Sequence, residues 1–388
     1  MIMSMRLKKL LALSLSVSLV STGIFVDVGM RSVTAAASKT KQAKDKKNVK
    51  KVKVTVAQKK TIKAPKSEKK TVWSIVSGQQ NISVIKKDNG EIKIKAQKSG
   101  NVKLQAKQGK KKTIYNITVK KQAPKKSEVK QLTKFYKECF IKSSKEMGNN
   151  WYADGDDFLH DKWIEWDDYG YIRGMSLEAK EILTEINLPW FKKIQYFGSV
   201  TGNNLKSIDL GNNPTLKYFF LDVGYGESAE EGNYPYLNKI DFSGCQNLEG
   251  VYINSVFNIK QIDLSNNRKI KTVNISHTPL DELKMPKTDC LKEVYMNWSK
   301  INELDLSNCT NIQKIGIIGC NPQSVTISLG NKTDKEISEF DIDVYSADVE
   351  TSVRFVANRE ISEVPKVRYE YGYLGYIDGG LDFLRNCI

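Results

Sequence analysis

Residues 237–322 decide the fold, because one short pattern occurs in them eight times. In order, the half-units read LNKIDFSGCQN (237–247), LEGVYINSVFN (248–258), IKQIDLSNNRK (259–269), IKTVNISHTP (270–279), LDELKMPKTDC (280–290), LKEVYMNWSK (291–300), INELDLSNCTN (301–311) and IQKIGIIGCNP (312–322). Positions one, four and six are apolar in every half-unit. In a strand, apolar residues at positions four and six point into a core while position five points outward. Two classes of half-unit alternate, so the full repeat is 21–22 residues long.

The repeat continues on both sides of this stretch. Toward the N-terminus, half-units begin at Leu205 and Leu216, and shorter matches begin at Ile172 and Phe191. Toward the C-terminus, alternating apolar residues continue less regularly beyond Ile337. We therefore expect repeats over residues 171–332, followed by irregular last coils and a C-terminal cap over 333–388.

The motif L-x-x-L-x-L-x-x-N/C resembles that of the leucine-rich repeat family. The resemblance implies a solenoid of 21–22-residue coils with short strands on two faces and little helix. Position nine carries small side chains that can bond to the turn backbone when buried; they are Asn213, Cys245, Asn267, Thr288 and Cys309. Cys245 and Cys309 are three coils apart, about 14 Å at the usual strand spacing, which is too far for a disulfide. We expect buried thiols there.

The first 37 residues have the order of a secretory signal peptide. Arg6, Lys8 and Lys9 precede a mostly apolar run over 10–26, and small residues follow at 34–37. A retained membrane anchor is the alternative, but the run is interrupted by serines and followed by Asp27. We expect cleavage after residue 37, a Lys-rich linker over 38–50, no membrane span after cleavage, and a secreted or wall-associated protein.

Residues 51–120 alternate apolar and polar side chains in short runs separated by turns. That pattern predicts a small antiparallel sandwich, with Trp73 packed between its two sheets. The segment resembles a bacterial immunoglobulin-like domain of the type-2 (Big) family, on the basis of Trp73-Ser74, DNGEI (88–92) and SGNVKL (99–104). The resemblance implies a spacer or adhesive module of a surface protein.

The charge of the chain is unevenly distributed. Its net charge is +17, and residues 38–125 alone hold 27 lysines against 4 acidic residues. These lysines could hold the protein to anionic wall polymers through counterion release. Alternatively, lysines at alternate strand positions are simply solvated and protect sheet edges. Nucleic acid is not an expected partner, because the chain is exported and lacks interleaved aromatic and basic residues.

Residues 121–170 are expected to form a hinge, an amphipathic helix and an N-terminal cap for the repeats. Ser127 is the candidate helix cap, and the helix is expected to end near Gly148. The acidic and aromatic segment 151–168 has two further interpretations, a calcium loop and a glycosidase-like carboxylate pair. The calcium loop lacks its glycine and distal Glu, and the segment leads straight into the first repeat, so a cap is favoured.

Outward position five supplies the binding candidates. In one class it holds Asp241, Asp263 and Asp305, with Lys284 between the last two. This row is a ladder for a cationic patch on a partner, a weak cation site, or simply a solvated face. In the other class, aromatic residues predict a docking stripe; the positions are Phe220, Tyr252, Asn274, Tyr295 and Gly316. The alternative is that an adjoining loop or the C-terminal cap covers these aromatic residues. An acidic insertion over 225–232 is expected to rim this surface.

These observations predict a mainly β protein, with a small immunoglobulin-like β-sandwich followed by a leucine-rich repeat solenoid. No enzyme motif, cofactor site or metal-ligand pattern stands out in the sequence. We expect a non-enzymatic recognition or adhesion protein that binds a protein or glycan at a cell surface. The alternative is an envelope-associated structural protein held to anionic wall polymers through residues 38–125. A hydrolase accessory that uses segment 151–168 is the third interpretation.

Overall fold

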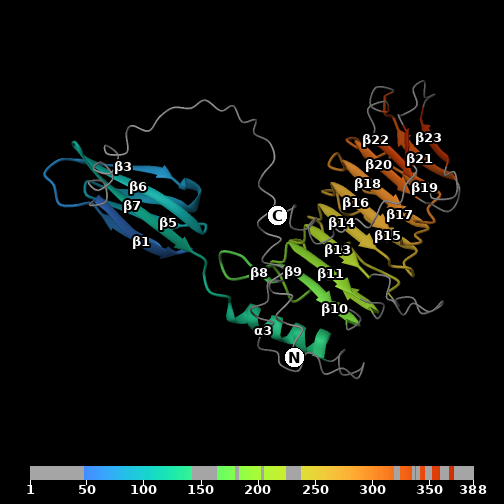
Figure 1. The fold of residues 1–388 in the computed structure, drawn as a ribbon, viewed down its shortest axis with the longest axis horizontal. Coiled ribbons are helices and arrows are strands. Elements are labelled where there is room, and N and C mark those ends of the chain that lie inside the picture. Colours follow the sequence, from blue (N-terminus) through green and yellow to red (C-terminus); the bar gives the residue numbers. More distant parts are fainter. Residues whose placement is uncertain are drawn as a thin grey trace, which may run out of the picture.

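The computed structural model (Figure 1) describes residues 48–141, 164–179, 183–201, 205–223, 237–318, 324–333, 337, 341–345, 352–358 and 367–370. The described chain is mainly β, which confirms the coarser part of the expected fold class. The signal peptide, most of the acidic and aromatic segment, the insertion over 225–232 and the C-terminal residues 371–388 lie outside the described residues.

The N-terminal region consists of two small sheets around one apolar cluster. One sheet has the order β1-β7-β6-β3 and the other the order β2-β5-β4. The elements are β1 (Val49–Thr55), β2 (Lys59–Lys63), β3 (Thr71–Ser77), the short helix η2 (Gln79–Asn81), β4 (Ile82–Lys87), β5 (Glu91–Ala96), β6 (Gly100–Gln108) and β7 (Lys111–Lys120). Trp73 is buried between the sheets, with its ring 5.6 Å from that of Tyr115. The Tyr115 hydroxyl donates to the carbonyl of Lys63 at 2.7 Å, which ties the two sheets together.

The C-terminal region is built around one ten-stranded sheet whose strands lie side by side in chain order (Figure 1). All its pairings are parallel except that of β8 with β9. Its strands are β8 (Ile164–Trp166), β9 (Ile172–Ala179), β11 (Tyr196–Thr201), β13 (Tyr218–Asp222), β14 (Gly250–Asn254), β16 (Thr272–Ser276), β18 (Glu293–Asn297), β20 (Lys314–Ile318), β22 (Asp341–Tyr345) and β24 (Val367–Glu370).

The other class of half-unit forms three smaller parallel sheets. They are β10 (Glu185–Asn187) with β12 (Ser207–Asp209); β15 (Gln261–Asp263) with β17 (Glu282–Lys284); and β19 (Glu303–Asp305) with β21 (Ser324–Gly330) and β23 (Ser352–Ala357). The chain therefore alternates between the large sheet and a smaller one. A coil in which both strands are formed contributes one strand to the large sheet and one to a smaller sheet.

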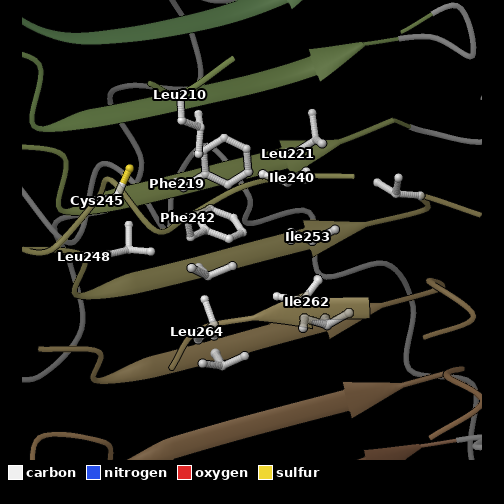
Figure 2. Close-up of a cluster of buried hydrophobic side chains, with 14 of the residues drawn as sticks. Leu210, Phe219, Leu221, Ile240, Phe242, Cys245, Leu248, Ile253, Ile262 and Leu264 are labelled. Atoms are coloured by element: carbon white, nitrogen blue, oxygen red, sulfur yellow. The ribbon is translucent and has the colours of Figure 1, made fainter. Parts of the chain in front are cut away.

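The core lies between these two sets of strands. The side chains of Phe219 and Leu221 project from β13 toward Phe242 and its neighbours in the facing half-unit (Figure 2). Cross-strand partners repeat the same residue position, so Val251 pairs with Val273 and Val273 with Val294. Each aliphatic side chain is therefore covered by its equivalents in the coils above and below. Complete burial of one such side chain stabilises the fold by roughly 1.5–3 kcal/mol.

The side chains at position nine of the half-units form a ladder that bonds the turns of successive coils. Asn213 Nδ2 donates to the carbonyls of Leu188 and Leu210, both at 3.1 Å. In the same way, Asn267 Nδ2 donates to the carbonyls of Phe242 and Cys245 at 3.0 and 2.8 Å. Both asparagines are fully buried. The carbonyls of Leu188, Phe242 and Cys245 also accept a backbone N–H, so the asparagine amides add a second hydrogen bond that links one turn to the next.

The remaining ladder positions use other chemistry for the same purpose. Thr288 Oγ1 donates to the carbonyl of Arg268 at 2.6 Å, and Cys309 is buried beside the carbonyl of Pro286. Cys245 and Cys309 are free thiols, and burial raises their pKa to about 12 and about 11. In the next coil the position is occupied by Lys332, which the sequence pattern does not predict. Its buried Nζ donates to the carbonyl of Cys309 at 2.6 Å.

One helix and its irregular continuation cover the first coil. The helix α3 (Lys126–Phe135) continues as a π-helical segment, η3 (Tyr136–Ile141), and its Phe135 ring packs 5.5 Å from that of Phe191. The expected cap at Ser127 is wrong, because the helix begins one residue earlier and has Lys125 at its N-cap. The buried Glu128 instead accepts from the Ile172 amide at 3.1 Å, and burial raises the pKa of Glu128.

Hydrogen bonds join the N-terminal sheets to the start of the repeats. The Asp168 carboxylate accepts from Ser99 N at 2.6 Å and from Ser99 Oγ at 2.7 Å. Lys121 Nζ donates to the carbonyl of Trp166 at 2.9 Å, and Gln122 N donates to that of Asp168 at 3.0 Å. One carboxylate of the acidic segment therefore acts as a connector between the two regions.

The asparagine ladder predicts a specific loss of stability. Asn267→Ala removes one of the two hydrogen bonds that each of these carbonyls accepts, the other coming from a backbone N–H. We therefore expect a loss of about 1–3 kcal/mol in the free energy of unfolding, the sum of two buried hydrogen bonds. Asn266→Ala is the matched control, because Asn266 is exposed in the same turn. Urea unfolding followed by circular dichroism measures both variants. Equal stability of the two would contradict the role given to the ladder.

Candidate functional site

The outer face of the ten-stranded sheet carries side chains in straight rows. Position five of each half-unit pairs with position five of the half-unit on the adjacent strand, in the order Gly198, Phe220, Tyr252, Asn274, Tyr295 and Gly316. Because parallel strands are about 4.8 Å apart, neighbouring side chains of the row are in contact range. The sheet thus brings together the five predicted docking residues, but it gives them different exposures.

Phe220 and Tyr252 are not exposed as expected. Their rings stack with centroids 4.6 Å apart, and the two residues are only 1% and 8% exposed. With Tyr196 they form a separate buried cluster on this face. Flat rings on adjacent strands remove each other's faces from water, which a residue-by-residue interpretation does not anticipate. Burial also raises the pKa of Tyr252 to about 12.

Beyond β14 the same row is more open. Asn274 and Tyr295 are partly exposed. The Tyr295 ring lies over the backbone of Gly316, where an added Cβ would be 2.5 Å from Tyr295 Cδ1. Lys314 Nζ lies 5.5 Å from the centroid of that ring. Because Gly316 has no side chain, the Tyr295 ring can lie flat on the sheet beside the Lys314 ammonium group.

A second row lies at the carboxyl ends of β14, β16 and β18. Ser255, His277 and Trp298 occupy equivalent positions, and all three have left-handed backbones, with φ of 57°, 46° and 53°. For residues other than glycine this conformation costs about 1–3 kcal/mol each, and it is rare for a bulky residue. The repeated turn is fixed by backbone bonds, since Ser255 N donates to the carbonyl of Ser276 and His277 N to that of Asn297.

The rings of this second row stack on each other. His277 and Trp298 have centroids 5.9 Å apart and planes inclined by only 13°, while Trp298 remains 45% exposed. His277 Nδ1 lies 3.2 Å from Asn254 Oδ1, and burial lowers the pKa of His277. None of these residues is among the sequence-predicted candidates. The sequence feature that could have identified them is their shared position, because all three are residue eight of a half-unit and the register of the strands places that position in one row.

The aspartate row on the smaller sheets has a local structural role. One carboxylate oxygen of Asp241, Asp263 and Asp305 accepts from the backbone N–H two residues later, at 2.8–2.9 Å. These bonds form the turn after each strand. Hydrogen bonds from Ser243 and Ser265 lower the pKa of Asp241 and Asp263. Lys284 pairs in register with Asp263 and lowers its pKa further.

Among the residues that the structure describes, no three His, Cys, Asp or Glu side chains lie close enough together to hold a metal ion. No helix there has the length and apolar character needed to cross a membrane.

Comparisons with known proteins identify no family. No family model matches the chain, and no curated protein matches it. One similar solved structure is the functional domain of InlJ from Listeria monocytogenes, which is described as including a cysteine ladder. It is 16% identical with a TM-score of 0.31, and the match covers 43% of this chain and 34% of that one. This likeness is too weak to carry an argument about function.

Proposed function

We propose that this chain is a secreted or surface-exposed bacterial recognition protein without enzymatic activity. In this proposal the C-terminal region is a solenoid of the leucine-rich repeat kind that binds a protein or glycan partner. The N-terminal region is an immunoglobulin-like module that presents it. The signal-peptide order of residues 1–37 and the 21–22-residue repeat support the proposal.

The observation that carries the proposal is the contrast within one sheet face. Phe220 and Tyr252 are buried, whereas Asn274 and Tyr295, on the next two strands of the same row, are partly exposed. A partner can therefore reach the row at Asn274 of β16 and Tyr295 of β18. Tyr295 is held in place by Gly316 and Lys314, so little side-chain freedom would be lost on binding. Rigid, partly exposed tyrosines are typical anchors of binding sites.

Alanine replacement of Tyr295 tests the proposal. The purified chain, immobilised on beads, is incubated with extracts of bacterial and host cell surfaces, and the retained material is identified and then titrated. We expect Tyr295→Ala to weaken binding of that material at least about tenfold, as for loss of an anchor residue.

Tyr169→Ala is the control, because its ring is 43% exposed at the junction and away from the sheet face. Circular dichroism shows whether both variants remain folded. Equal retention by the unmodified chain and Tyr295→Ala would contradict the use of this face.

A specific observation also favours the alternative envelope-associated role. In the N-terminal sheets, Lys59 stands directly opposite Lys95, and Lys107 opposite Lys112. Like charges opposite each other on paired strands are unfavourable. A polyanion bound across these positions would relieve the repulsion. This supports the proposal that residues 38–125 bind anionic wall polymers.

Salt dependence tests this alternative. We expect retention of the purified chain on isolated bacterial cell walls to fall steeply between about 50 and 500 mM NaCl, because bound lysines release counterions. The double variant Lys59→Glu/Lys95→Glu should lose most of that retention at low salt. Lys260→Glu, an exposed change in the repeat region, should keep it. Retention that is insensitive to salt and unchanged in the Lys59→Glu/Lys95→Glu variant would contradict an electrostatic role.

A further inference from the structure

The row formed by Ser255, His277 and Trp298 has features that the fold alone does not require. The turns after β14, β16 and β18 each have a left-handed residue, and glycine adopts that conformation without strain. The chain instead places a tryptophan in it at φ 53° and leaves the ring 45% exposed. Among the tryptophans that the structure describes, Trp298 is the most exposed. A strained backbone that presents a large apolar ring to solvent indicates a binding role.

The ring is a rigid platform. One face of Trp298 stacks on His277, whose own Nδ1 is held by Asn254 Oδ1 at 3.2 Å. The two rings are nearly parallel, at 13°. A ligand that stacks on the exposed part of Trp298 would therefore meet a surface that is already ordered. Aromatic ring faces carry partial negative charge, so they attract the partially positive C–H groups of a saturated ring.

The polar groups that bond beside the platform are amides and hydroxyls, and the charge that acts on His277 is that of the Asp222 carboxylate at the end of β13. Asn297 Nδ2 donates to Ser276 Oγ at 3.0 Å, and Ser276 Oγ donates to Asn274 Oδ1 at 3.0 Å. Asn297 Oδ1 and Ser255 Oγ are buried without a hydrogen-bond partner among the described residues. An unpaired buried acceptor is unfavourable, and a hydroxyl donor from a ligand that reaches Asn297 Oδ1 would satisfy it. Amides match hydroxyl groups because both can donate and accept.

We propose that the carboxyl ends of β14, β16 and β18 form a binding subsite for a neutral saccharide, with one pyranose ring stacked on Trp298 and its hydroxyls bonded to Asn297 and neighbouring amides. The proposal rests on the recognition function above and assigns the ligand class. The strand spacing of about 4.8 Å is close to the length of one pyranose unit, so a chain of sugars can run along the row. An anionic ligand is disfavoured, because the Asp222 carboxylate acts electrostatically on His277 and the bonded groups named here are uncharged amides and a hydroxyl.

The test uses three neutral oligosaccharides as probes: chitotetraose, cellotetraose and maltotetraose. Saturation-transfer NMR and isothermal titration with the purified full chain should show binding of at least one of them. Trp298→Gly should weaken that binding at least about tenfold. Because glycine removes the strain at φ 53°, the melting temperature of this variant should be unchanged or higher.

Two further variants separate binding from folding. Asn297→Ala should also reduce saccharide affinity, whereas Tyr169→Ala, an equally exposed aromatic elsewhere, should leave it unchanged within about twofold. Binding of none of the three probes by the unmodified chain, or equal binding by Trp298→Gly, overturns the saccharide assignment. If retention of surface material by the immobilised chain still depends on Tyr295 in that case, the recognition function stands, and its ligand is not a saccharide bound at this subsite. If that dependence is also absent, both proposals fail.

Discussion

The constraint on which the structure depends is the constant register between successive coils. A single short strand cannot bury its apolar residues, but a stack of coils in the same register covers each one from both sides. Val251, Val273 and Val294 illustrate this, because each pairs directly with its equivalent in the next coil. The same register aligns the buried ladder that contains Asn213 and Asn267. A shift of one residue would turn the apolar set outward and separate the ladder from its carbonyls.

A stack of this kind has two ends that must be covered. At the N-terminal end, Leu132 and Phe135 of α3 and Cys139 of η3 are fully buried in the common core. Further along, Lys332 takes the ladder position and bonds the preceding turn with its ammonium group. The connection to the N-terminal sheets uses a different segment, the turn between β8 and β9, where Asp168 binds Ser99. Covering the stack and joining the two regions are therefore tasks of two neighbouring parts of the chain.

Much of this architecture can be predicted from the sequence, because period and apolar positions depend on local spacing. The burial of Ile262, Leu264, Leu304 and Leu306 follows directly from their places in the repeat. The solvent exposure of outward-facing residues cannot be predicted from their position in the repeat, because it depends on the side chains of adjacent strands. Phe220 and Tyr252 were predicted to be exposed and instead stack in a buried cluster. The importance of Trp298 likewise depends on a backbone angle and on His277 in the adjacent coil.

The most direct test of this account measures the register itself. In the protein labelled at Ile, Leu and Val methyl groups, methyl NOEs report which side chains lie in adjacent coils. The account predicts strong NOEs between Val251 and Val273, between Val273 and Val294, and between Val294 and Ile315. It predicts none between Val251 and Ile315, which are three strands apart, about 14 Å. Absence of the three neighbour contacts, or contacts displaced to other positions, would contradict the stacked coils and the two surfaces derived from them.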